Sequence, residues 1–105
     1  MCAKIEYLLP PEPLYKIQSN YVFLTREMDT MYTDLLDRSL NEGVLNMDEK
    51  LEIDALSSPS ERCAKLLSIL RRKTQKQYEI FVDALVASRQ PHVADVLRLG
   101  SFSIF

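Results

Sequence analysis

Signals that start a new helix recur at short intervals in the second half of this chain. Those at Asn46 and Thr74 have the spacing of a capping box, in which two side chains each bond the other's backbone N–H at a helix start. The signal at Ser58 has the same spacing and adds a proline at the first helical position, and the fourth is such a proline alone. The four signals are Asn46 with Glu49, Ser58 before Pro59 with Glu61, Thr74 with Gln77, and Pro91. A helix that must end before the next one begins is short, so the chain is predicted to form short helices joined by tight connections.

Apolar residues spaced three and four apart fill the intervals between these signals. They predict helices over residues 14–28, 30–41 and 47–56, and further helices beginning after Ser58, after Thr74 and at Pro91. In the segment 30–41, the side chains expected to face inward are Met31, Tyr32, Leu35, Leu36 and Leu40. The only two glycines, Gly43 and Gly100, are expected to end helices in the left-handed conformation. A chain of 105 residues forms one core, so an all-α bundle of six helices is predicted.

The ends of the chain have a different character. Pro10, Pro11 and Pro13 predict an extended lead-in over residues 1–13, since proline interrupts helices. The predicted domain is then residues 14–99, and residues 100–105 form a tail. Two groups of apolar residues do not fit the helical stripes: Val22 with Phe23, and Met47 with Leu51. A kink would explain the first pair, and either core packing or an exposed second contact would explain the other.

Charge is divided sharply between two segments. Residues 27–54 contain nine acidic and two basic residues, a local net charge of −7. Residues 62–76 contain six basic residues and no acidic ones. Opposite charges on two faces predict head-to-tail docking, which propagates into a ring or filament instead of closing as a twofold dimer. Charge runs on helices are also often only solvated faces, and that alternative stays open.

Several chemistries find little support in the composition. Cys63 and His92 are the only thiol and imidazole pair in the predicted domain, and Cys63 lies on an apolar stripe, where cysteine usually packs as a small hydrophobe. No His, Cys or Asp cluster has metal-ligand spacing, and the glycines of a phosphate-binding loop are missing. The sequence predicts no enzyme activity and no cofactor. Two cysteines suit a reducing compartment, and no run approaches the ~20 apolar residues of a membrane span, so a cytoplasmic location without membrane contact is expected.

Three stretches within about residues 14–99 stand in a distinctive order: LLDRSLNEGVLNMDEKLEI, SERCAKLLSILRRK and YEIFVDALVASRQPHVADVL. Together they resemble the caspase recruitment domain family of the death-fold superfamily. The residues that carry the resemblance are Gly43, Val44, Leu45, Glu49, Ile53, Arg62, Leu66, Leu67, Ile69, Leu70, Tyr78, Phe81, Ala84, Leu85, His92 and Leu97. The chain departs from the family at RRKTQKQ, where many members have a glycine.

The resemblance implies a six-helix antiparallel Greek-key bundle with a kinked first helix, and a function in homotypic docking. In this family a basic surface on the first and fourth helices commonly meets an acidic surface on the second and third. The basic positions in this chain are Arg26, Arg62, Lys65 and Arg72. The acidic positions are Asp34, Asp37, Asp48 and Glu52. The implied partner is a caspase, adaptor or receptor with a domain of the same family, in apoptotic or innate-immune signalling, and homo-oligomers or helical filaments are expected.

The sequence is also consistent with other functions and other families of the death fold. The domain could block such assembly as a decoy, or it could be a death domain or death effector domain, which share the bundle. The basic segment 62–76 could contact nucleic acid, since a basic helix attracts phosphates. The strongly acidic segment opposes that reading because it would repel the nucleic-acid backbone, so no nucleic-acid partner is expected.

Overall fold

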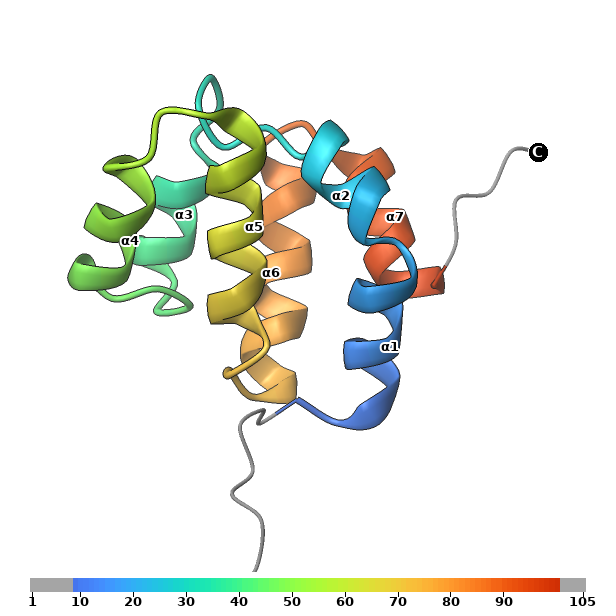
Figure 1. Cartoon of the computed structure of the whole chain (residues 1–105). Coiled ribbons are helices and arrows are strands. Elements are labelled where there is room, and N and C mark those ends of the chain that lie inside the picture. Colours follow the sequence, from blue (N-terminus) through green and yellow to red (C-terminus); the bar gives the residue numbers. More distant parts are fainter. Residues whose placement is uncertain (1–8, 101–105) are drawn as a thin grey trace, which may run out of the picture.

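The structure, a computed structural model, describes residues 9–100, and within them it contains seven α-helices and no strand. The helices are α1 (Pro11–Ser19), α2 (Tyr21–Glu27), α3 (Leu35–Asn41), α4 (Met47–Asp54), α5 (Pro59–Leu70), α6 (Gln75–Ala87) and α7 (Pro91–Leu99). Only Asn20 separates α1 from α2, so these two form one kinked first helix (Figure 1). Counted in this way, the molecule is the expected six-helix antiparallel Greek-key bundle.

The kink lies at Asn20, whose backbone leaves the helical conformation. The Asn20 side-chain amide donates hydrogen bonds of 2.9 Å to the carbonyls of Lys16 and Gly100, which ties the kink to the end of α7. The kink lets Phe23 pack against the core, while Val22 stays exposed. Gly100 adopts the left-handed conformation and ends α7, as expected.

The first helix begins at Pro11, three residues earlier than predicted. Proline suits this position because its φ is already helical and its missing N–H would have had no partner there. The Leu14 N–H closes the first turn on the Pro10 carbonyl at 3.3 Å, and Pro13 is buried. The prediction of extended chain through Pro13 is therefore wrong. Residues 1–8 of the lead-in and 101–105 of the tail lie outside the described residues, so the division of the chain into lead-in, domain and tail stays a prediction.

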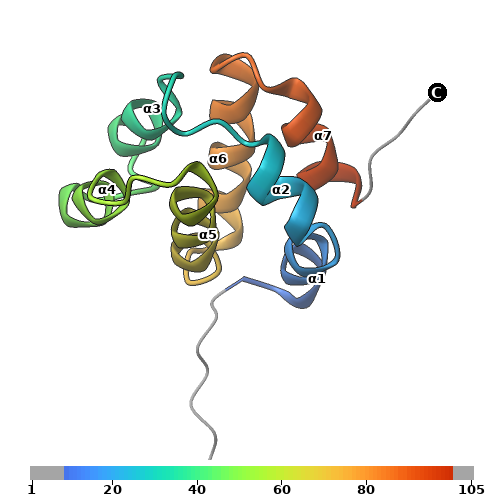
Figure 2. The same ribbon diagram turned by 45° about the horizontal axis from the view of Figure 1, so that its top comes forward.

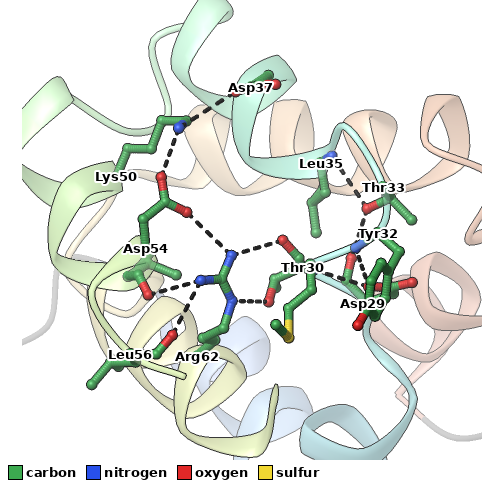
Figure 3. A network of polar contacts seen from close by, with 12 residues as sticks. Asp29, Thr30, Tyr32, Thr33, Leu35, Asp37, Lys50, Asp54, Leu56 and Arg62 are labelled. Atoms are coloured by element: carbon green, nitrogen blue, oxygen red, sulfur yellow. Dashed lines mark hydrogen bonds and ion pairs between the residues drawn. The ribbon is translucent and has the colours of Figure 1, made fainter. Parts of the chain in front are cut away.

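The second predicted helix also has a different start, because α3 begins at Leu35 instead of Thr30. The Asp29 carboxylate accepts hydrogen bonds of 2.9 Å from the N–H groups of Met31 and Tyr32, and these bonds offer the backbone an alternative to a helix (Figure 3). Residues 28–34, which we call the α2–α3 loop, consequently leave the Tyr32 side chain 86% exposed. The expected burial of Met31 and Tyr32 is wrong.

The Gln90 side chain holds the α2–α3 loop to the opposite turn. Its amide oxygen accepts from the Asp29 N–H at 2.7 Å, and its amide nitrogen donates to the Asp29 carbonyl at 3.0 Å. Gln90 is buried, and its amide also reaches the hydroxyl groups of Thr33 and Ser88. The loop is thus fixed by specific polar contacts between segments 61 residues apart.

The predicted start signals of the later helices are confirmed. Both capping boxes form, at Asn46 for α4 and at Thr74 for α6, and the Ser58 hydroxyl accepts from the Glu61 N–H at the start of α5. The turn after α5 needs no glycine, since φ is −62° at Arg71 and −80° at Thr74.

The core lies between two central helices and the elements around them (Figures 1 and 2). Helix α5 packs against α2 and α4, while α6 packs against α3 and α7. Val44 and Leu45, which follow Gly43, insert into this core as predicted. The largest fully buried side chains are Phe81, Ile17, Leu24, Leu35, Ile53, Leu66, Leu67, Ile69, Leu70, Leu85, Leu97 and Val44.

Gly43 has a φ of +84°, and a methyl group there would meet no atom within 4 Å. Gly43→Ala therefore strains only the backbone, and we expect it to lower the free energy of unfolding by about 1 kcal/mol. Gly43→Asn is the matched control, because asparagine tolerates this conformation better, and it should lose less. Urea unfolding followed by circular dichroism measures both. Equal stability of the alanine variant and the native chain would contradict the role assigned to Gly43.

Candidate docking surfaces

Four exposed carboxylates form an acidic surface on α3, α4 and the residue just before α3; the two helices lie side by side at one edge of the bundle (Figure 1). The carboxylates are Asp34, Asp37, Asp48 and Glu52, and we call this set the acidic surface. Asp34 pairs with Arg38 at 2.9 Å, and Asp37 lies 3.5 Å from the Lys50 ammonium group. Asp48 forms no side-chain hydrogen bond or ion pair with any residue in the range 9–100. All four predicted acidic positions are therefore exposed, and Asp48 alone of them has no ion-pair partner within residues 9–100.

Three of the four predicted basic positions also lie on the outside. Arg26 is in the last turn of α2, Lys65 is in the middle of α5, and Arg72 is the second residue after α5. We call these three residues the basic surface. Arg26 and Arg72 are exposed, and their guanidinium groups form no ion pair with the described residues. Lys65 differs, because its ammonium group lies 3.6 Å from Glu52. The basic and acidic surfaces therefore meet along the junction of α5 and α4.

Arg62, the fourth predicted basic position, is buried, with only 7% of its surface exposed. Its guanidinium group donates to the Thr30 carbonyl at 3.0 Å and the Thr30 hydroxyl at 3.1 Å. It also donates to the carbonyls of Ile53 and Leu56, each at 3.3 Å, and to the Asp54 carboxylate at 3.1 Å (Figure 3). Ile53 belongs to the last turn of α4, where carbonyls lack partners within the helix. The prediction that Arg62 lies in a docking surface is wrong, because this side chain stabilises the interior.

A chain of charged side chains connects Arg62 with the acidic surface. The Lys50 ammonium group lies 2.7 Å from Asp54, between that carboxylate and Asp37 (Figure 3). The hydrogen bond from Lys50, with further help from Arg62, holds the pKa of Asp54 below its usual value. The same hydrogen bond raises the pKa of Lys50. Lys50 and Asp54 are not among the predicted site residues, although their spacing of four residues on one helix signals such a pair.

A second residue of the basic segment 62–76, Lys73, is also held in an ion pair within the molecule. Lys73 donates to both Glu49 carboxylate oxygens, at 2.9 and 3.1 Å, and both side chains are largely covered. This pair joins the turn after α5 to the start of α4. Lys73 is therefore less available to a partner than Arg72 beside it.

Met47 and Leu51 lie one turn apart on α4 and are 54% and 56% exposed. The alternative in which they belong to the core is therefore wrong. Acidic Asp48 and Glu52 follow them directly in the sequence. Whether they form a second contact stays a prediction.

The Cys63 side chain is fully buried in the core. Its thiol donates to the Met28 carbonyl at 2.9 Å, and burial, with a smaller contribution from Asp29, raises its pKa to about 11. A buried thiol with a raised pKa is a poor nucleophile. No hydrogen bond joins it to His92 in the described range, and this range contains no group of three or more His, Cys, Asp or Glu residues suited to hold a metal ion.

Comparisons with known proteins agree with this fold. The family model described as Caspase recruitment domain matches residues 15–100. Apoptotic protease-activating factor 1 from Danio rerio is 30% identical over 74 residues, which cover 70% of this chain and 6% of that protein. The chain thus spans only a small part of that relative. A comparison with solved structures gave no significant match.

The helical bundle and its charged surfaces define a protein-interaction module of the death-fold type. The chain belongs to the caspase recruitment domain family. Over residues 9–100 none of its helices has the length and apolar composition needed to cross a membrane.

Removing the Arg62 side chain should destabilise the domain strongly. Arg62→Met leaves the carbonyls of Leu56 and Thr30 without a donor and removes one of the two donors to the Ile53 carbonyl, and we expect a loss of about 3 kcal/mol in the free energy of unfolding. Arg72→Met removes an exposed arginine and should change stability by less than about 0.5 kcal/mol. Urea titration of both variants makes the comparison. Similar small losses in the two variants would contradict the interior role of Arg62.

The thiol of Cys63 should react slowly. A rise in pKa from 9.0 to about 11 leaves a thiolate fraction about 100-fold smaller at pH 8, and burial slows reaction further. In a Cys2→Ser background, Cys63 is the only thiol. Iodoacetamide should then alkylate the folded protein at least about 100-fold more slowly than the same protein in urea. Equal rates in the two states would contradict the buried position of Cys63.

Proposed function

We propose that this domain docks head to tail onto other caspase recruitment domains, with the basic surface of one molecule against the acidic surface of the next. The observation that carries the proposal is that Arg26, Arg72 and Asp48 are exposed charges without an ion-pair partner in residues 9–100. An exposed charge that the fold itself does not use is available to a partner. Complementary surfaces of this kind govern encounter rate and specificity more than raw affinity.

The arrangement of the two surfaces favours an open assembly. They occupy different helices of the same molecule, so a molecule that uses its basic surface still presents its acidic surface to another. Such a heterologous contact repeats until a ring closes or a helical filament grows. Met47 and Leu51 would provide an apolar contribution at the edge of the acidic surface, since they lie beside Asp48 and Glu52.

The partner we infer is a caspase, an adaptor or a receptor that carries a domain of the same family, met in the cytoplasm during apoptotic or innate-immune signalling. The similarity to a protein named apoptotic protease-activating factor supports the apoptotic assignment. A domain that binds a partner with one surface but cannot extend the assembly would act as an inhibitor. Filament growth distinguishes a domain that promotes assembly from such an inhibitor. Nucleic-acid binding is the less favoured function because Arg62 and Lys73 are occupied inside the fold.

Charge reversal tests the docking mechanism. Arg72→Glu or Asp48→Lys should each weaken self-assembly, or binding to a tagged partner domain, by at least about 10-fold, since like charges then face each other. Asp37→Lys should act in the same direction. Mixing the Arg72→Glu and Asp48→Lys proteins should restore part of the contact. Light scattering and pull-down at about 0.1 M salt provide the measurements.

Arg98→Glu on α7 is the matched control, since Arg98 is exposed and lies in neither surface. Circular dichroism should show unchanged helicity in all variants. If both reversals leave scattering and pull-down at the native level, the docking mechanism is wrong. Binding of duplex DNA at low salt would instead support the nucleic-acid function.

A further inference from the structure

Among residues 9–100, Tyr32 is the most exposed of the large apolar and aromatic residues, at 86%. It lies in the α2–α3 loop, whereas Tyr15 and Tyr21 lie in α1 and α2, and the Tyr78 side chain is buried. A phenol oxygen receives a phosphoryl group only when it lies in line with the γ-phosphorus of a nucleotide in another protein's active site. A side chain on an irregular loop can reach such a site without the unwinding of a helix. Among the tyrosines in residues 9–100, Tyr32 alone has this position.

Acidic residues flank Tyr32 on both sides. Glu27 and Asp29 precede it by five and three residues, and Asp34 follows by two. This pattern complements a basic substrate groove, and charge patterns of this kind contribute to the choice of substrate by kinases. The Asp29 carboxylate also fixes the loop by accepting the N–H groups of Met31 and Tyr32.

A surface cavity of about 650 Å³ beside Tyr32 is lined by two arginines. Tyr32, Arg38 and Arg89 all line it, together with His92. Its acidic lining residues include Asp29, which bonds the loop backbone, Asp34, which pairs with Arg38, and Glu27. The Arg89 side chain forms no hydrogen bond or ion pair with residues 9–100.

Arg89 is held in an unfavourable backbone conformation. Its φ is +71°, and it is the only residue other than glycine with a positive φ in the described range. This conformation costs about 1 kcal/mol, a cost that glycine would avoid. The left-handed conformation closes α6, since the Arg89 N–H bonds the Val86 carbonyl at 3.0 Å and the Gln90 N–H bonds the Leu85 carbonyl at 2.8 Å. In this position Arg89 is exposed and lines the cavity with Tyr32.

We propose that Tyr32 is a phosphorylation site for a tyrosine kinase with a basic substrate groove, and that Arg38 and Arg89 bind the resulting phosphate. The Tyr32 phenol oxygen attacks the γ-phosphorus of ATP, and the bond between that phosphorus and the β–γ bridging oxygen breaks. The phenol proton passes to the general base of the kinase, and ADP leaves. Paired guanidinium groups are well suited to bind a phosphate dianion.

The modification would also change docking, a consequence that rests on the proposed function. A phosphate adds between about −1.5 and −2 charges two residues from Asp34. If Arg38 turns to the phosphate, Asp34 loses its partner, so the acidic surface becomes more negative by either route. Phosphorylation should therefore strengthen docking to a basic surface by several-fold at low salt and less at high salt.

Incubation of the full chain with ATP and a tyrosine kinase that accepts acidic Glu–Tyr copolymers tests the site. Tyr7 lies outside the described residues, so it is replaced by phenylalanine in every protein compared. Mass spectrometry should find phosphate on Tyr32, and Tyr32→Phe should lower total incorporation at least 10-fold. Tyr15→Phe is the matched control and should leave incorporation unchanged. Equal incorporation into the Tyr32→Phe protein would overturn the proposal, whether or not the domain docks.

Titration by ³¹P nuclear magnetic resonance tests the two arginines. Bound guanidinium groups favour the dianion, so the second ionisation of the phosphate should move below its ordinary value near pH 6, by about 0.5 pH unit. Arg89→Gln should remove at least half of that change, while Arg98→Gln should not affect it. An ionisation equal to that of free phosphotyrosine would overturn the assignment of Arg38 and Arg89.

Discussion

The arrangement of the elements on one side of this bundle depends on the buried guanidinium group of Arg62. It joins three pieces of chain with no continuous hydrogen-bond ladder between them: the α2–α3 loop, the end of α4 and the first turn of α5. The acceptors are carbonyls, a hydroxyl and a carboxylate, and the Thr30 and Leu56 carbonyls have no other donor among the described hydrogen bonds. A planar group with five N–H donors can satisfy all of them at once, which lysine could not.

Because Arg62 is buried, fewer basic residues can take part in the proposed docking. With Arg62 and Lys73 occupied inside the fold, the basic surface consists of Arg26, Lys65 and Arg72, and Lys65 already lies near Glu52. The two surfaces therefore touch within one molecule, and the chain from Asp37 through Lys50 and Asp54 links the acidic one to Arg62. A partner that draws on these carboxylates competes with an existing polar network, so the charges without partners are the better candidates for docking.

In the α2–α3 loop, the contacts that stabilise the backbone also leave one side chain, that of Tyr32, exposed to solvent. Asp29, Gln90 and Arg62 fix its backbone from three sides, and Tyr32 is left outside. Because the loop lies at the start of α3, any group added to Tyr32 lies close to the acidic surface. The exposed phenol of Tyr32, the strained Arg89 and the acidic positions are therefore neighbours in the fold. The sequence pattern did not predict that these groups lie close to one another.

Features that depend on residues three or four apart were determined by the sequence itself. The capping boxes at Asn46 and Thr74, the left-handed glycines and the division of charge all followed from local patterns, because a cap or a helical stripe involves only one turn. The resemblance to a family supplied the topology and the kink. Only the tertiary structure decided that Arg62 is buried, that α3 starts at Leu35 and that Met47 and Leu51 are exposed. Those outcomes depend on contacts such as the one between Arg62 and Thr30, 32 residues apart, whose energy appears only when distant segments are packed together.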